Sequence, residues 1–365
     1  MLRNILFLFF GLLFYAGSSA IAPETSINYD TISTGPYIYK DNNKIKAKWI
    51  DHGRMRSDVL TADNFYEFKN RFHLLFDYDD LRNTYLLKPN HTQVYTSVDS
   101  LSAISDIHGE YNTYINLLKA SGIIDENLNW IYGKGHLVIL GDAFDRGDKV
   151  TQILWHLFGL EKQAEKAGGM VHVILGNHEL LIFGNDETYM NEKYKKVEEI
   201  FQERFSELFS ANSVLGSWLR SKPIVITIND ILFVHAGISI EMVDRKFKIE
   251  QINRGFYDML AGKEIQSDAD YEKLIFLNDD SGPLWYRGYF REQDFSENQL
   301  DSILTFYNMK HIVVGHTHCD GINPIFKNKI FGIDAGISVG MPGEMLIYKN
   351  GIFYGGSATG KRNKF

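Results

Sequence analysis

Short apolar runs that end in aspartate, asparagine or histidine dominate the chain from about residue 98 onward. The first three such runs occupy residues 101–104, 137–140 and 171–175. Helical periodicity follows the first two runs, over 111–120 and 150–167, and Gly122 and Gly168 stand where those segments should end. Alternating strands and helices predict a largely parallel α/β core. In such cores ligands collect beyond the carboxyl ends of the strands, so the polar residues there are candidate site residues.

Other apolar runs predict hairpins and single strands. Asp41-Asn42-Asn43, Asn229-Asp230 and Asn350-Gly351 each separate two apolar runs and carry turn-forming residues. The predicted hairpins and single strands cover residues 36–50, 222–235, 312–314, 330–334 and 345–354.

The segment 184–220 interrupts this pattern. Its apolar residues recur at helical spacing, namely Tyr194, Val197, Phe201, Phe205, Leu208 and Phe209. This spacing predicts an amphipathic helix. We expect either a lid or substrate-recognition insert beside the site or a packed surface helix.

Size and charge limit the classes of function. The 365 residues fit either two domains or one large α/β domain. The net charge of −8 argues against a broad surface that binds nucleic acid. Because Cys319 is the sole cysteine, neither an intramolecular disulfide nor a cysteine-rich zinc site can form.

The first twenty residues have the features of a secretory signal peptide. Arg3 precedes an apolar run over 5–16, and Ser18-Ser19-Ala20 supplies small residues for cleavage. The run is shorter than the roughly 20 residues of a spanning helix, so we expect no stable membrane anchor after cleavage. An exported protein without disulfides is compatible with a bacterial periplasm or with secretion. We expect three parts: a signal peptide (1–20), an N-terminal extension with a β-hairpin (21–97) and a catalytic domain (98–360) that contains the insert 184–220.

Five segments carry residues that can bind metal ions. They contain Asp106-Ile107-His108, Asp142-Ala143-Phe144-Asp145-Arg146, Asn177-His178-Glu179, His235-Ala236-Gly237 and His316-Thr317-His318. Carboxylate, amide oxygen and imidazole together suit Mn, Fe or Zn rather than Ca or a thiolate-bound metal. The number of ligands predicts two metal ions that share Asp142. The first would be held by Asp106, His108 and Asp142, and the second by Asp142, Asn177, His235 and His316.

Two such ions suit chemistry at phosphorus. Metal ions roughly 3.5–4 Å apart can clamp the attacking and leaving oxygens of an in-line displacement, and they acidify a bridging water, which becomes the nucleophile. His178 can donate a proton to the leaving oxygen, and Asp145 can orient His178 and hold it protonated. Arg146 can pair with phosphoryl oxygens through its planar guanidinium. The motifs offer no covalent nucleophile, so we expect direct attack of the hydroxide.

These segments resemble the calcineurin-like metallophosphoesterase superfamily. Asp106-x-His108-Gly109, Gly141-Asp142-x-x-Asp145-Arg146-Gly147 and Gly176-Asn177-His178-Glu179 are similar to the three signatures of its phosphoprotein-phosphatase branch. His235-Ala236-Gly237 and Gly315-His316-Thr317 are similar to its later metal-binding histidines in bacterial members. Ile333-Asp334-Ala335-Gly336-Ile337-Ser338, with the long insert after Glu179, looks most like the Shewanella-like phosphatases.

The resemblance implies a layered α/β/β/α sandwich with two divalent metal ions, Mn first and Fe or Zn as alternatives, at the C-terminal ends of the strands. It also implies a second phosphate-binding arginine between the last two ligand histidines. Arg287 is the candidate, because Gly288 permits close backbone approach, and Arg291 is its rival. Other metallophosphoesterases of the superfamily often have a Gly-His-x-His motif whose second histidine binds the first metal ion. The resemblance therefore implies that His318 completes the ligand shell of the first metal ion.

The expected function is that of an exported, dinuclear-metal-dependent phosphomonoesterase. Its substrate would be a phosphorylated protein or a small phosphoester. The same ligands would also serve a nucleotide or dinucleoside polyphosphate hydrolase, because they contact the phosphoryl group alone. A third alternative is a non-catalytic binding protein on the same fold. The oligomeric state stays open.

Overall fold

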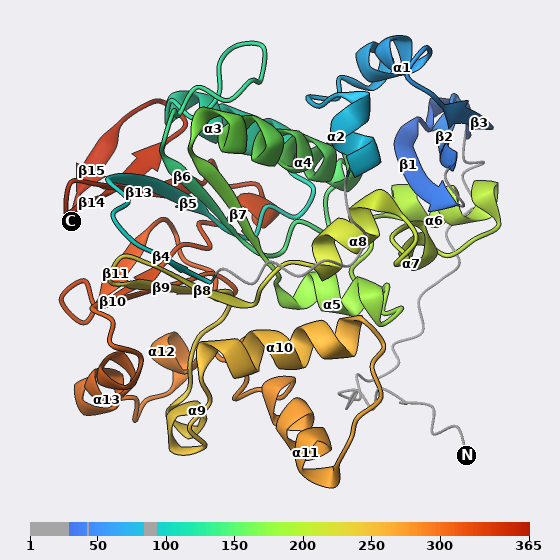
Figure 1. The fold of residues 1–365 in the computed structure, drawn as a ribbon. Coiled ribbons are helices and arrows are strands. Elements are labelled where there is room, and N and C mark those ends of the chain that lie inside the picture. Colours follow the sequence, from blue (N-terminus) through green and yellow to red (C-terminus); the bar gives the residue numbers. More distant parts are fainter. Residues whose placement is uncertain (1–28, 42–43, 84–92) are drawn as a thin grey trace, which may run out of the picture.

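Two six-stranded sheets lie face to face in the middle of the molecule, with helices on their outer sides (Figure 1). This computed structural model describes residues 29–41, 44–83 and 93–365. The predicted signal peptide therefore lies outside the described residues. Within the described ranges, no helix is long and apolar enough to cross a membrane.

The first sheet joins the early strands to the end of the chain. Its order is β15 (Arg362–Lys364), β14 (Ile352–Ser357), β13 (Glu344–Lys349), β5 (Ser100–Ile104), β6 (His136–Leu140) and β7 (Met170–Ile174). β5, β6 and β7 run parallel, whereas β13 pairs antiparallel with both β5 and β14.

The second sheet has a similar mixture. Its order is β11 (Asn323–Ile325), β12 (Ile330–Gly332), β10 (His311–Val314), β9 (Ile231–Val234), β8 (Val225–Ile228) and β4 (Val94–Tyr95). β9, β10 and β12 run parallel, and β8 turns back antiparallel to β9. Three neighbouring strands of each sheet are thus parallel as predicted, and the hairpins predicted over 222–235 and 345–354 add antiparallel strands beside them.

The layers follow from the alternation of side chains along each strand. Successive residues of a strand point to opposite faces. In β6, Val138 and Leu140 belong to the core between the two sheets, whereas Leu137 and Ile139 pack under the helices. Such strands are apolar on both faces because both faces are covered. The expected α/β/β/α sandwich is thus observed.

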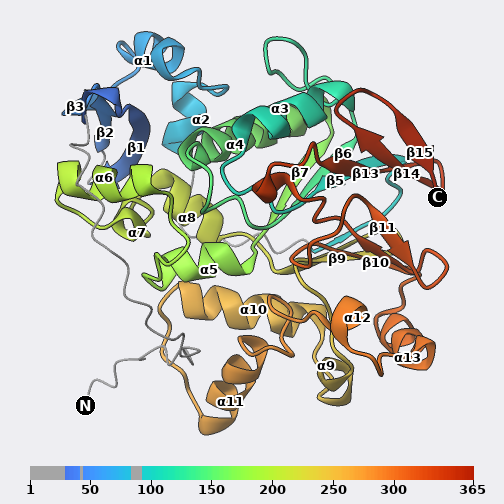
Figure 2. The same cartoon turned by 180° about the vertical axis from the view of Figure 1, so that it is seen from behind.

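Helices cover the outer face of each sheet (Figures 1 and 2). α3 (Tyr111–Ala120) and α4 (Val150–Ala167) lie on the first sheet and have the bounds that their periodicity predicts. The helices beside the second sheet are α9 (Ile240–Asp244), α10 (Ile249–Leu260), α11 (Asp268–Leu277), α12 (Gly288–Arg291) and α13 (Glu297–Tyr307). The short α5 (Asn177–Phe183) follows β7 directly.

The N-terminal part forms a small antiparallel sheet. It consists of β1 (Thr34–Asp41), β2 (Lys44–Asp51) and β3 (Arg54–Leu60), preceded by a 3-10 turn (Tyr29–Thr31) and followed by α1 (Phe65–Phe72) and α2 (Tyr78–Asn83). The predicted hairpin corresponds to β1 and β2, and β3 was not expected. Trp155 of α4 donates its indole N–H to the carbonyl of Pro36 at 2.8 Å, which ties this sheet to the main body. The division of the chain at residue 98 stays a prediction, although β4 already pairs with β8 in the second sheet.

The insert 184–220 contains three short helices where the sequence predicts one. They are α6 (Glu192–Phe201), α7 (Phe205–Leu208) and α8 (Val214–Arg220). α6 ends because Gln202 adopts a left-handed conformation, with φ of 53°. The predicted apolar face is nevertheless used, since Phe201 and Phe209 pack edge-on against Tyr37 of β1. Most of the insert is therefore packed structure between the small sheet and α4.

A buried histidine in α4 makes stability depend on pH. Nε2 of His156 lies 3.1 Å from the carbonyl oxygen of Leu128, which can only accept, so Nε2 carries the ring proton. Nδ1 accepts from the Tyr114 hydroxyl at 2.9 Å. Burial lowers its pKa from 6.5 to about 4. As the pH falls below 6.5, His156 takes up a proton in the unfolded chain but stays neutral in the folded chain. The free energy of unfolding therefore decreases until about pH 4, where His156 is protonated in the folded chain as well.

We therefore expect His156→Gln to flatten this dependence. Between about pH 7.5 and pH 5, the free energy of unfolding should fall by about 2 kcal/mol less in the variant than in the parent. Urea unfolding at the two pH values measures this difference. His52→Gln is the matched control, because the His52 side chain is 81% exposed. Equal losses in His156→Gln and the parent would contradict the assignment.

Candidate active site

Loops after five strands bring the predicted ligands together at the carboxyl ends of those strands. Asp106 and His108 follow β5, Asp142 follows β6, Asn177 and His178 begin α5 after β7, His235 follows β9, and His316 follows β10. All seven side chains are buried, and none is more than 6% exposed. The carboxyl ends of the strands therefore meet in one polar cluster inside the protein.

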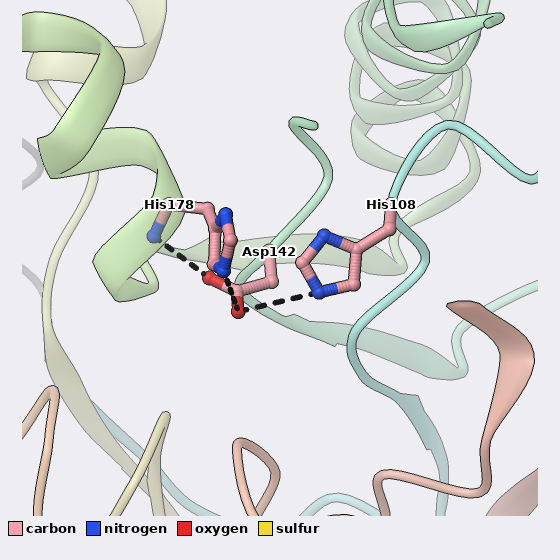
Figure 3. A group of neighbouring side chains, drawn as sticks. All are labelled: His108, Asp142 and His178. Atoms are coloured by element: carbon pink, nitrogen blue, oxygen red, sulfur yellow. Dashed lines mark hydrogen bonds and ion pairs between the residues drawn. The ribbon is translucent and has the colours of Figure 1, made fainter. Parts of the chain in front are cut away.

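Asp142 stands at the centre of this cluster (Figure 3). Its Oδ2 lies 3.3 Å from Nε2 of His235, 3.6 Å from Nε2 of His108 and 3.9 Å from Nε2 of His178. Its Oδ1 accepts the backbone N–H of His178 at 3.0 Å. Burial alone would raise the pKa of Asp142, but the surrounding imidazoles hold it well below the usual value. Asp142 is thus a carboxylate that faces three imidazoles.

Two overlapping groups could each hold a metal ion. Ligand atoms of His108, Asp142 and His178 lie within 4.8 Å of one another, and so do those of Asp142, His235 and His316. Asp142 belongs to both groups, as expected of a ligand that two metal ions share. The first group contains His178, which was not predicted as a ligand, in place of Asp106.

The second ring nitrogens of two histidines fix the orientation of their rings. Nδ1 of His108 lies 2.7 Å from the Phe144 carbonyl, and Nδ1 of His235 lies 2.7 Å from the Leu140 carbonyl. In both rings Nε2 then faces Asp142. Metal-binding histidines commonly have such a partner, because it fixes the tautomer and aims the ligand nitrogen.

The remaining predicted ligands lie next to these groups. Oδ1 of Asp106 is 3.9 Å from Nε2 of His108, and its Oδ2 accepts the backbone N–H of His316 at 2.9 Å. Oδ1 of Asn177 is 2.9 Å from Nε2 of His235. Asp106 therefore lies beside the first predicted metal position and Asn177 beside the second.

His316 offers an independent sign that a cation belongs here. Among the described residues, its Nε2 is buried and has no hydrogen-bond partner. Burial lowers the pKa of His316 to about 2, so the ring is neutral. A buried polar atom without a partner costs free energy, and a metal ion would remove that cost. The donor set and this unpaired nitrogen fit divalent metal ions.

The site backbone is strained. Left-handed φ values occur at Asp106 (53°), His108 (44°), Asp142 (57°), Asp145 (68°), Arg146 (59°) and His316 (61°). Such conformations cost about 1–3 kcal/mol each and persist where the surroundings enforce them. The backbone N–H of His108 donates to the carbonyl of Asp142 at 2.8 Å, which is one of the bonds between loops that hold them.

The Glu179 carboxylate also holds the loops of the site in place. Its carboxylate accepts the backbone N–H groups of Asp142 at 2.9 Å, Ala143 at 2.8 Å and Gly176 at 2.7 Å. The side chain is 2% exposed, so these bonds are sheltered from water. Glu179 thus ties the loop after β6 to the start of α5.

His178 forms a buried pair with Asp145. Its Nδ1 lies 2.5 Å from Oδ2 of Asp145. Burial alone would lower the pKa of His178, but the carboxylates of Asp142 and Asp145 outweigh it and the pKa is raised. The pair holds Nε2 of His178 on the side of Asp142.

The two predicted phosphate-binding arginines occupy different environments. Arg287 is half-buried and donates from its guanidinium to the carbonyl of His316 at 2.6 Å. Its rival Arg291 is exposed at the end of α12. Arg146 is exposed and donates to the hydroxyl of Ser338 at 3.0 Å. The structure brings Arg287 to the cluster, and it places Arg146 on the solvent side.

Known proteins resemble this chain in sequence and in fold. A sequence model of the family described as Calcineurin-like phosphoesterase matches residues 101–320, which hold every predicted metal ligand. The chain belongs to the calcineurin-like phosphoesterase family. Among the relatives of this phosphoesterase, Shewanella-like protein phosphatase 1 of Plasmodium berghei (strain Anka) is 31% identical over 250 residues, which cover 65% of this chain and 67% of the relative. Shewanella-like protein phosphatase 2 of Arabidopsis thaliana is 24% identical over 66% of this chain and 72% of its own.

Solved structures extend the likeness to nearly the whole phosphoesterase. The crystal structure of a cold-active protein-tyrosine phosphatase from a psychrophilic Shewanella species has a TM-score of 0.81 and 34% identity. The match covers 92% of this chain and 99% of the other. This calcineurin-like phosphoesterase is therefore a metal-dependent phosphatase of the Shewanella-like type.

His318 lies outside both groups of this phosphoesterase. Its side chain is 46% exposed, with Nδ1 3.9 Å from Oδ1 of Asp334 and Nε2 3.9 Å from Oδ1 of Asp320. His316 turns inward, whereas His318 is half exposed two residues later, and its place in the first metal's ligand shell stays a prediction.

Asp334 is a residue that sequence reasoning did not assign to the site. It is 6% exposed, and burial raises its pKa. Its negative charge acts on Asp106, whose pKa rises through burial first and through Asp334 second. The signal was present in the sequence, since Asp334 follows an apolar run as the predicted ligands do.

Proposed function

We propose that the protein is an exported, dinuclear-metal-dependent phosphomonoesterase that acts on phosphorylated side chains of proteins or peptides. The observation that carries this proposal is Asp142, which belongs to two metal-binding groups and lies beside the His178–Asp145 pair. Because the Shewanella protein of similar structure is a protein-tyrosine phosphatase, phosphotyrosine is the first substrate to test.

The chain's own residues would divide the work between them. The residues that would hold divalent metal ions, Mn first and Fe or Zn as alternatives, are Asp106, His108, Asp142, Asn177, His235 and His316. When bound there, the ions would supply Lewis acidity toward a phosphoryl group and toward water. Arg287 and Arg146 would bind phosphoryl oxygens. His178 would donate a proton from Nε2 to the leaving oxygen, because Asp145 occupies its Nδ1.

A covalent route through cysteine does not suit this chain. Cys319 is the sole cysteine, and burial raises the pKa of its thiol. A cysteine nucleophile reacts as the thiolate, which a raised pKa disfavours. We therefore propose direct attack of water on phosphorus.

Export is part of the proposal because residues 1–20 have the features of a signal peptide. Expression of the full chain in a bacterium should yield a shortened protein outside the cytoplasm. N-terminal sequencing of that protein locates the cleavage, and an uncleaved cytoplasmic product would argue against export.

The activity is tested on the purified chain with phosphotyrosine and phosphoserine peptides of one sequence. We expect hydrolysis with Mn²⁺, loss of activity after chelation and recovery when Mn²⁺, Fe²⁺ or Zn²⁺ is returned. Full activity in the metal-stripped protein would refute the proposal.

Dinucleoside tetraphosphate is the comparison substrate, since a symmetrical bis(5'-nucleosyl)-tetraphosphatase of Buchnera aphidicola is 34% identical over 142 residues, or 38% of this chain. No turnover of any substrate with any metal would favour a binding protein.

A further inference from the structure

Tyr189 presents an aromatic ring to solvent beside the candidate acid. Its side chain is 51% exposed, whereas His178 is 5% exposed. The two ring centroids are 5.1 Å apart, with the planes tilted by 58°. The Tyr189 ring thus contacts the buried imidazole and continues from it to the surface. Neither metal binding nor proton donation by His178 requires this aromatic group.

The segment that carries Tyr189 is hydrogen-bonded to the loop that carries Arg146. The carbonyl of Tyr189 accepts the backbone N–H of Arg146 at 3.0 Å, and the side-chain amide of Asn191 donates to the carbonyl of Arg146 at 2.6 Å. The neighbouring Met190 is 7% exposed and anchors the chain in the core. Because the backbone of Tyr189 is held at these points, its ring loses little conformational entropy when a ligand binds. This favours the affinity for that ligand.

The position of His178 decides what the Tyr189 ring would contact. A proton donor must lie within hydrogen-bond reach of the oxygen that leaves. The part of the substrate that is bonded to the leaving oxygen would then contact the side chains around His178. Tyr189 is the exposed aromatic side chain among those groups in the described part of the chain.

We infer that Tyr189 is a specificity-determining residue that packs against the leaving group and favours aryl phosphates over alkyl phosphates. The inference rests on the proposed function, because it needs His178 to face the leaving oxygen. The side chain of phosphotyrosine brings an aromatic ring bonded to that oxygen, and aromatic pairs pack well with centroids about 4.5–7 Å apart. Phosphoserine brings a single methylene group, which offers Tyr189 little surface.

The test compares Tyr189→Ala with the parent on two peptides of one sequence, one with phosphotyrosine and one with phosphoserine. We expect kcat/KM for the phosphotyrosine peptide to fall about tenfold, mostly through KM, while the phosphoserine value changes less than about twofold. Because each ratio is taken within one substrate, the different reactivity of the two esters cancels. Tyr189→Phe should keep the parent preference, since the ring remains.

Tyr271→Ala is the matched control, because Tyr271 is a 48% exposed tyrosine on α11, away from α5 in Figure 1. Equal losses on both peptides, or none on either, would overturn the role of Tyr189. A parent protein that hydrolyses neither peptide would instead refute the proposed function. The two failures are therefore distinguishable in one set of assays.

Discussion

Asp142→Asn should remove phosphatase activity while the protein stays folded. Oδ2 of Asp142 faces Nε2 atoms of His235 and His108 at 3.3 and 3.6 Å, and the residue belongs to both metal-binding groups. Asparagine puts either a neutral oxygen or an N–H donor at that position, and neither can bridge two cations. A loss of several kcal/mol in transition-state stabilisation corresponds to a fall in kcat/KM of about a thousandfold or more.

The measurement combines steady-state kinetics in Mn²⁺ with the metal content per chain. We expect metal content to fall together with activity. The fold should survive, because the asparagine Oδ1 can still accept the backbone N–H of His178. In the parent protein Oδ1 of Asp142 accepts this N–H at 3.0 Å. Asp320→Asn is the matched control, since that side chain is 99% exposed and should leave activity unchanged. Two metal ions per chain and activity within tenfold of the parent would contradict the bridging position.

The regular elements around the site could be predicted because each has a local signal. α3 and α4 have the predicted bounds since their apolar periodicity is long and Gly122 and Gly168 follow them. Strand ends are equally readable where a buried apolar run stops at a charged residue. The carboxyl ends of parallel strands meet, so His108 after one strand and Asp142 after the next could be predicted to lie together.

Features that depend on tertiary contact could not be predicted. The single helix expected over 184–220 is broken at Gln202, where packing against the small N-terminal sheet prevails over periodicity. The left-handed backbone at Asp142 is not a property of aspartate, because bonds from neighbouring loops and from Glu179 impose it. Arg287 could be preferred to Arg291 because of Gly288, but the bond from Arg287 to the carbonyl of His316 could not be predicted.

His178→Asn should slow catalysis and leave metal content unchanged, which separates it from Asp142→Asn. A positioned proton donor contributes about 10²–10⁴-fold to the rate of such reactions. Asparagine retains the backbone N–H that Asp142 binds and removes the imidazole that Asp145 orients. We therefore expect kcat to fall within that range while KM for the same peptide changes little.

A series of aryl phosphates makes this prediction specific to proton donation. A leaving group that departs as a stable phenolate needs no proton, whereas a poor one does. The loss of kcat in His178→Asn should therefore be small for nitrophenyl phosphate and grow as the leaving group becomes more basic. Asp145→Asn should show the same trend more weakly, because the Asp145 carboxylate would act through its contact with Nδ1 of His178. An equal loss for every leaving group would show that His178 serves metal binding or substrate binding instead, which its place in the first metal-binding group would then explain.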